Sequence, residues 1–196
     1  HALHGVPVAV NVGDALSLLG LRALIDNRQR LGPRLTLRIL EEAERMAALE
    51  VRLDQVLSGK ARPRDALECI EFALALYAKA SHVESARMYA EAFAEDAALA
   101  EDLAHSHRYN AACSAALAAA LGGEDAAEWR GRALEWLRAE LAARKKAGTG
   151  LAQTLEHWKQ DPDLAAARDI LDELPNPECE AWPSLWTAVD RALAGG

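Results

Sequence analysis

The stretch from His105 to Gly123, HSHRYNAACSAALAAALGG, limits the folds open to this chain more than any other part of the sequence. Its second half is mostly alanine, which loses no side-chain entropy in a helix, and it ends at two glycines, a common way to close a helix. Only 5% of the 196 residues are aromatic, whereas 51% are hydrophobic. The sequence therefore predicts an all-α protein in which small side chains let helices come close.

The length and the net charge of the chain limit the functions that it can have. A chain of this length can bury a sizeable core as one domain or two small ones. Its formal net charge of −8 disfavours nucleic acid as a partner, because phosphate binding needs clustered Lys and Arg. We expect the short basic run at residues 144–146 to complement the negative end of a helix. No apolar run reaches the roughly 20 residues that span a bilayer, so we expect no membrane association.

The cysteines indicate the compartment. Cys69, Cys113 and Cys179 are widely spaced and form neither a CxxC pair nor a disulfide framework. The N-terminus also lacks the flanks of a signal peptide. We therefore expect a cytoplasmic protein, and the absence of an initiating Met indicates a piece of a longer chain.

The clearest break in the chain is SGKARPRD, residues 58–65, where Gly59 and Pro63 interrupt two long helical patterns. We expect three parts: a two-helix segment over 1–57, a linker over 58–65, and a helical repeat domain with a C-terminal capping helix over 66–196. In the first part, helices are predicted over residues 10–25 and 33–57. The apolar side chains that share one face of the second helix predict that it needs a packing partner: Leu37, Leu40, Ala43, Ala47 and Val51.

Two stretches of the first part, HGVPVAVNVGDALSLLGLRAL and RILEEAERMA, resemble the all-helical polyprenyl diphosphate synthases over about the first fifty residues. In that family two aspartate-rich motifs hold magnesium and the diphosphate. Neither is present: EEAER at 41–45 lacks the two-aspartate spacing, DILDE at 169–173 has no partner motif, and Asp14 is not a ligand. We therefore expect no enzyme, with a fragment or fusion of an isoprenoid synthase as the alternative.

Residues 66–97, ALECIEFALALYAKASHVESARMYAEAFAEDA, resemble a tetratricopeptide repeat (TPR), a helix-turn-helix unit of 34 residues. The resemblance implies large apolar contacts in the first helix and small ones where the two helices meet. The large residues are Cys69, Phe72 and Leu76, the small ones are Ala73, Ser85 and Ala92, and Tyr89 takes the aromatic position of the second helix. The sequence departs from the TPR pattern at three positions, where Cys69, Leu76 and Ala97 replace the usual Trp, Tyr and Pro.

The pattern of paired helices with small contact residues continues after residues 66–97. A helix through residues 108–121 ends at Gly122 and Gly123, and the next, over 125–146, places Ala133 and Leu137 at the contact spacing. In a third unit, Asp161 is a natural N-cap and Pro162 a natural first residue, so one helix ends near Gln160 and another starts at once. We expect a final helix to cover the last apolar face with Trp182, Trp186 and Val189. The fold class is thus all-α, with TPR-like antiparallel hairpins stacked as a short solenoid.

Several segments taken together are similar to the repeat-bearing C-terminal region of bacterial eukaryote-like serine/threonine kinases, over about residues 53–194. They include RMYAEAFAEDAALAEDL, TLEHWKQDPDLAAARD and LWTAVDRAL. The resemblance implies a repeat module downstream of a kinase domain rather than the kinase. The glycine-rich loop, V-A-I-K and D-F-G signatures are absent. HRY at 107–109 has tyrosine where the H-R-D aspartate would stand.

The sequence offers further candidate sites, and ordinary helix packing is the competing explanation for their residues. A zinc site of His105, His107 and Cys113 would have spacings of two and six, unlike the three or four of ligands on one helix face. A Cys-His nucleophile has no evident orienting group. We expect loop histidines and a core cysteine instead. The tryptophans could form a binding surface, but their helical spacing favours core packing: Trp129, Trp136, Trp158, Trp182 and Trp186.

The sequence thus favours a non-catalytic interaction module that binds a protein or peptide, or another segment of its parent chain. The residues that we expect to face a partner groove are Tyr77, Arg108, Tyr109 and Asn110. Asn110 could instead bridge backbone groups between helices. We expect no cofactor and no bound metal, and the oligomeric state stays open.

Overall fold

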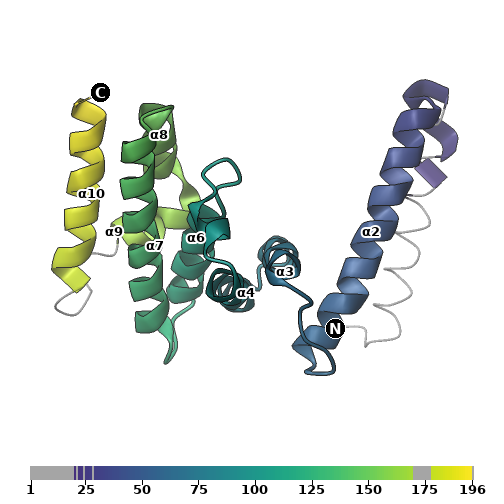
Figure 1. The fold of residues 1–196 in the computed structure, drawn as a ribbon, viewed down its shortest axis with the longest axis horizontal. Coiled ribbons are helices and arrows are strands. Elements are labelled where there is room, and N and C mark those ends of the chain that lie inside the picture. The colour runs from purple at the N-terminus through teal and green to yellow at the C-terminus, as the bar shows by residue number, and fades with distance from the viewer. Residues whose placement is uncertain (1–19, 21, 24, 28, 170–177, 196) are drawn as a thin grey trace. The chain divides into compact units, whose positions relative to one another are not determined.

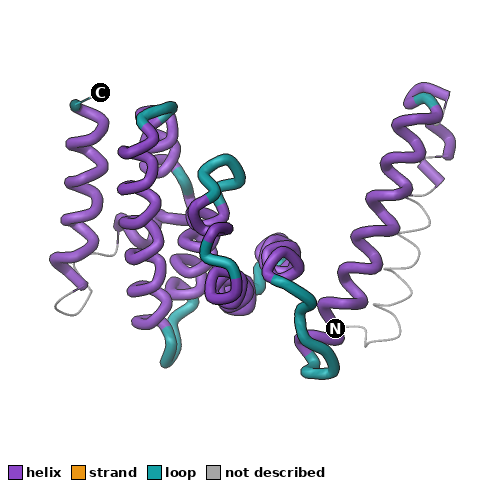
Figure 2. The backbone as a smooth tube through the Cα atoms, in the orientation of Figure 1, coloured by secondary structure: helices purple, strands orange, loops and turns teal. Residues whose placement is uncertain are grey.

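A computed structural model describes residues 20, 22–23, 25–27, 29–169 and 178–195 of the chain. Within these residues the backbone is helix or loop and contains no strand (Figure 2), so the predicted all-α class is confirmed. The chain divides into two compact units, residues 1–54 and 55–196. Most of HGVPVAVNVGDALSLLGLRAL lies outside the described residues, and with it Asp14 and most of the helix predicted over residues 10–25. Residues 170–173 of DILDE and the side chain of Cys179 also lie outside them.

Helix α2 (Pro33–Leu57) has the predicted bounds and begins at the predicted proline. Gly32 precedes it with a φ of +76°, and the carbonyl of Gly32 accepts a hydrogen bond from the Thr36 hydroxyl at 2.9 Å. The face that was expected to pack is open, because Leu37, Leu40 and Val51 are all exposed. The described residues of its own unit therefore leave this apolar face uncovered.

The second unit begins with the hairpin of α3 (Ala66–Ala78) and α4 (His82–Glu95), as predicted. Asp65 caps α3 by accepting a hydrogen bond from the amide of Glu68 at 2.9 Å, which satisfies an otherwise unpaired first-turn donor. The small residues lie where the helices meet: Ala73 and Ser85 are fully buried, and the Ser85 hydroxyl donates to the Ala73 carbonyl at 2.8 Å. Small side chains at these positions thus bring the two backbones together.

The second hairpin joins α6 (His107–Ala120) to α7 (Ala126–Ala147), after the short α5 (Ala98–Glu101). Gly122 and Gly123, with φ of +76° and +97°, terminate α6 as predicted, because glycine takes left-handed φ without steric cost. Ala133 and Leu137 are fully buried at the predicted contact positions. Along the unit, α3 packs on α4, α4 on α6, and α6 on α7 (Figure 1).

The chain then reverses through α8 (Leu151–Gln160), the 3-10 turn η1 (Pro162–Leu164) and α9 (Ala165–Asp169). Asp161 is the N-cap of η1 and accepts a hydrogen bond from the amide of Asp163 at 2.9 Å. The predicted stop near Gln160 and immediate restart at Pro162 are therefore confirmed. This sharp turn brings Asp161 and η1 against α6.

Helix α10 (Glu178–Ala194) closes the unit by packing on α7, α8 and α9. Trp182 and Val189 are buried on its inner face, and the half-buried Trp186 donates its indole N–H to the Ala167 carbonyl at 3.1 Å. Trp129, Trp136 and Trp158 are buried as well. The tryptophans therefore belong to the core, as their spacing predicted. None of the described helices is both long and apolar enough to cross a membrane.

Candidate functional site

Three of the four residues expected to face a partner line one pocket in the second unit. Tyr77 comes from α3, and Tyr109 and Asn110 come from the first turn of α6. The pocket has a volume of about 270 Å³ and is also lined by Leu74 and Tyr89. Residues from two separate helices thus line one shared pocket.

The opposite wall of the pocket carries two carboxylates that follow α8. Asp161 accepts hydrogen bonds from the Tyr109 hydroxyl and from the amide of Asp163, while Asp163 accepts one from the Tyr77 hydroxyl. His157, one turn before Asp161 on α8, places its Nε2 3.4 Å from the Asp161 carboxylate. The two tyrosines therefore tie α3 and α6 to the turn between α8 and α9.

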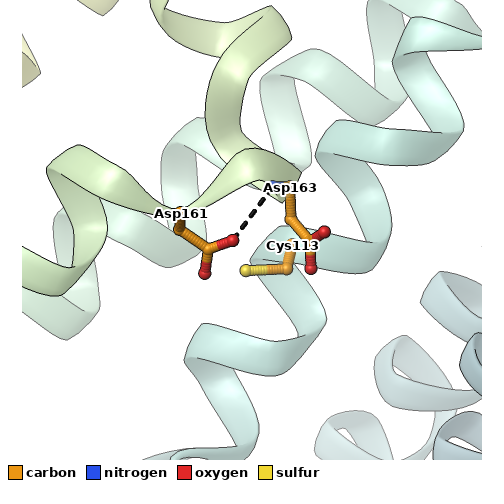
Figure 3. A group of neighbouring side chains, drawn as sticks. All are labelled: Cys113, Asp161 and Asp163. Carbon is orange, nitrogen blue, oxygen red and sulfur yellow. Dashed lines mark hydrogen bonds between the residues drawn. The ribbon is translucent and has the colours of Figure 1, made fainter.

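Cys113 of α6 lies beside these two carboxylates (Figure 3). Its Sγ and one carboxylate oxygen from each of Asp161 and Asp163 lie within 4.8 Å of one another. Burial raises the pKa of the Cys113 thiol, and the negative charges of the two aspartates raise it further. The thiol is accordingly protonated at neutral pH when no cation is nearby.

The tyrosine hydroxyls act as fixed donors to this cluster. The hydrogen bond to Asp163 is the main cause that raises the pKa of Tyr77, whereas burial is the main cause for Tyr109. The ring of Tyr109 is held by stacking on Trp158, with centroids 5.3 Å apart and planes inclined by 13°. Tyr109 is thus oriented by packing on one side and by Asp161 on the other.

A third tyrosine, Tyr89 of α4, is buried against the same pocket and is 1% exposed. Its hydroxyl lies within reach of the Asn110 side chain, which opposes the rise of its pKa, but the two form no hydrogen bond of normal geometry. Burial raises the pKa of Tyr89, so this hydroxyl stays protonated. A buried hydroxyl without a well-aligned partner is uncommon in folded proteins and marks this wall of the pocket as able to receive a polar group.

The structure does not bring Arg108, the fourth predicted groove residue, to this pocket. Arg108 is buried and pairs with the carboxylates of Glu101 and Glu140. Neighbouring residues of a helix point about 100° apart, so the side chain next to Tyr109 faces a different element. Arg108 belongs instead to a buried ion-pair network that Arg144 completes through Glu140 at 2.8 Å.

The zinc set weighed from the sequence is not assembled. The rings of His105 and His107 stack with centroids 5.4 Å apart, and Nδ1 of His105 lies 2.7 Å from the Asp102 carboxylate. In the described part of the chain, the group that could meet around an ion contains Cys113 but neither of these histidines.

The sequence reasoning missed the residues that complete the pocket. Asp161 was interpreted only as a helix cap, and Tyr89 only as a core aromatic. Tyr109 and Asp161 are 52 residues apart, and Tyr77 and Asp163 are 86 apart. Local spacing contains no signal for such pairs.

Comparison of the chain with protein-family models, with curated proteins and with solved structures finds no match.

Proposed function

We propose that this chain is a non-catalytic, TPR-like interaction module that binds an extended peptide segment of a protein partner. The observation that carries the proposal is the pocket described above, because the first helices of successive hairpins all contribute to it: α3, α6 and α8. In a stack of helix pairs, the first helices share one face. A pocket on that face is where such a module would receive its partner.

The order of packing supports a TPR-like stack. Each helix from α3 to α7 that belongs to a hairpin packs on the next one along the chain, and the small residues lie at the contacts. Ser85 of α4 lies 3.0 Å from Ser114 of α6, so the second helix of one pair touches the first helix of the next. Contact between consecutive helix pairs is one feature of a helical-repeat solenoid.

An exposed apolar stripe on α3 leads to the pocket. Leu67, Leu74 and Tyr77 are 61%, 45% and 37% exposed, and their spacing of seven and three places them along one side of the helix. Leu74 and Tyr77 also line the pocket. Two or three apolar anchors beside a polar pocket are sufficient for peptide recognition, since a few residues carry most of the binding energy.

The charge of the chain favours a basic partner. The net charge is −8, and the pocket is lined by two aspartates and by no Lys or Arg among the described residues. Charge of one sign around a site steers partners of the opposite sign and accelerates their association. We therefore expect a segment with apolar side chains for the α3 stripe and a net positive charge.

A phage-displayed library of random peptides, screened against the full chain, tests the proposal. The expected result is enrichment of basic sequences with two or more apolar positions. Binding of a selected synthetic peptide should weaken at least about tenfold in Leu74→Ala and Tyr77→Ala, since a hot-spot truncation costs at least about 2 kcal/mol. Leu121→Ala is the matched control, because Leu121 is exposed outside the pocket. Failure to enrich peptides, or equal weakening by Leu121→Ala, would reject the proposal.

A further inference from the structure

We infer that the pocket between α3, α6 and η1 binds a divalent transition-metal ion of the zinc class. The ligands are Cys113 Sγ, one carboxylate oxygen from each of Asp161 and Asp163, and Nε2 of His157. This inference does not depend on the proposed function, since an ion could occupy the pocket whether or not a peptide binds across its mouth.

The donor atoms already lie close together. The thiol sulfur and the two carboxylate oxygens are within 4.8 Å of one another (Figure 3), and Nε2 of His157 is 3.4 Å from the Asp161 carboxylate. In a tetrahedral zinc site with bonds of about 2.0 to 2.3 Å, donor atoms are about 3.3 to 3.8 Å apart. Small rotations of these three side chains would close them around an ion, and a rotation of the His157 imidazole, whose Nε2 lies outside the 4.8 Å group, would add the fourth donor.

The chemistry of the donors distinguishes this site from an ordinary acidic patch. Sulfur and imidazole nitrogen prefer zinc-class ions, whereas magnesium and calcium prefer oxygen ligands alone. Cys113 and Asp161 are buried, and no Lys or Arg among the described residues lines the pocket to balance the carboxylates. A divalent cation supplies that balance.

The buried hydroxyl of Tyr89 is a second polar group at this pocket. It is buried against the same pocket as Cys113, and its contact with the Asn110 side chain lacks normal hydrogen-bond geometry. A buried hydroxyl without a well-aligned partner is costly, and the polar coordination shell of an ion offers it one.

The surroundings of the carboxylates resemble an outer ligand shell. The Tyr109 hydroxyl donates to Asp161 and the Tyr77 hydroxyl donates to Asp163. Hydrogen bonds of this kind orient metal-binding carboxylates and limit their rotation. On coordination the S–H bond of Cys113 breaks, its proton passes to the solvent, and the thiolate donates an electron pair to the ion.

Titration of the full chain with Co²⁺ tests the inference, because Co²⁺ replaces zinc in such sites and a cobalt–thiolate bond produces a charge-transfer band in the near ultraviolet. We expect saturation at one equivalent and loss of the band when Zn²⁺ is added. Cys113→Ser should abolish the band, and Asp163→Asn should weaken binding at least tenfold. Cys69→Ser is the matched control, since Cys69 is also buried and free but lies outside the pocket, and it should bind like the wild type.

Three outcomes would overturn the inference. They are no saturable binding, a thiolate band that persists in Cys113→Ser, and binding that is lost in a His105→Ala, His107→Ala double variant but retained in Asp163→Asn. Circular dichroism of each variant confirms that it folds. Should Cys113→Ser unfold, Asp163→Asn still tests the site, because asparagine has nearly the same size as aspartate. Since no peptide is present, a negative titration leaves the proposed function standing, and a failed peptide screen leaves the titration unaffected.

Discussion

The hydroxyl oxygens of Ser85 on α4 and Ser114 on α6 lie 3.0 Å apart in the interior of the second unit. Ser85 also donates to the Ala73 carbonyl at 2.8 Å, and Ser114 lies 3.0 Å from the Asn110 carbonyl. Two hydroxyl protons are thus shared among three contacts that connect α3, α4 and α6. Both serines are fully buried, so this junction has room for a hydroxymethyl group and little more.

Enlarging Ser114 is therefore expected to separate the helices. Ser114→Leu should lower the free energy of unfolding by about 1 to 3 kcal/mol through overpacking, whereas Ser114→Ala should lower it by about 1 kcal/mol through the lost hydrogen bond. Urea unfolding followed by circular dichroism measures both. If the leucine variant were as stable as the alanine variant, α4 and α6 would not meet closely at this position.

Glu140 is expected to be the most sensitive charged residue of the second unit. It is 1% exposed and pairs with the buried Arg108 and with Arg144. Glu140→Ala therefore removes the buried carboxylate between two cations, and Arg108 keeps only its pair with the exposed Glu101 among the ion pairs described. We expect a loss of about 3 to 5 kcal/mol, measured by urea unfolding.

Asp190→Ala is the control for Glu140, because it breaks the exposed pair of Asp190 with Lys159 at 2.7 Å. An exposed pair contributes about 0 to 1 kcal/mol. Equal losses of unfolding free energy in the two variants would show that burial does not determine how much the Glu140 ion pairs stabilise the protein.

The second unit is expected to fold without the first. Because residues 55–196 form a compact unit and Asp65 caps α3 from within that unit, a polypeptide of residues 60–196 should melt cooperatively. Circular dichroism as a function of temperature checks this. A gradual loss of helicity without a transition would mean that residues before 60 belong to the same core.

Stability should fall at alkaline pH through Cys69. Burial raises the pKa of this thiol from 9.0 to about 11, with a smaller contribution from the negative charge of Glu91. The unfolded chain therefore loses this proton at lower pH than the folded chain does. The stabilisation is fully present below pH 9 and is lost as the pH rises from 9.0 towards 11.

The measurement is the free energy of unfolding of the wild type and of Cys69→Ser between pH 7 and 10.5, under reducing conditions. The wild type should lose stability more steeply above pH 9 than the variant. Parallel curves would show that the Cys69 thiol titrates alike in the folded and unfolded chain.

The sequence alone determined the helices and where they end. Pro33, the pair Gly122–Gly123 and the step from Asp161 to Pro162 each act on the backbone within a few residues, so their effect can be inferred locally. The buried small residues Ala73 and Ser85 were also inferred in this way, since helical spacing assigns each residue to a face. The TPR-like stack and the two resemblances stay predictions.

Only the tertiary structure decided what those faces meet. Tyr77 and Tyr109 were candidates from the sequence, but their carboxylate partners come from a turn 86 and 52 residues away. Arg108 stood beside the groove residues in the sequence and yet points to Glu140 in the core. Helical periodicity fixes the relative directions of side chains on one helix, whereas contacts between helices depend on how the whole unit packs, and that information is spread over the entire chain.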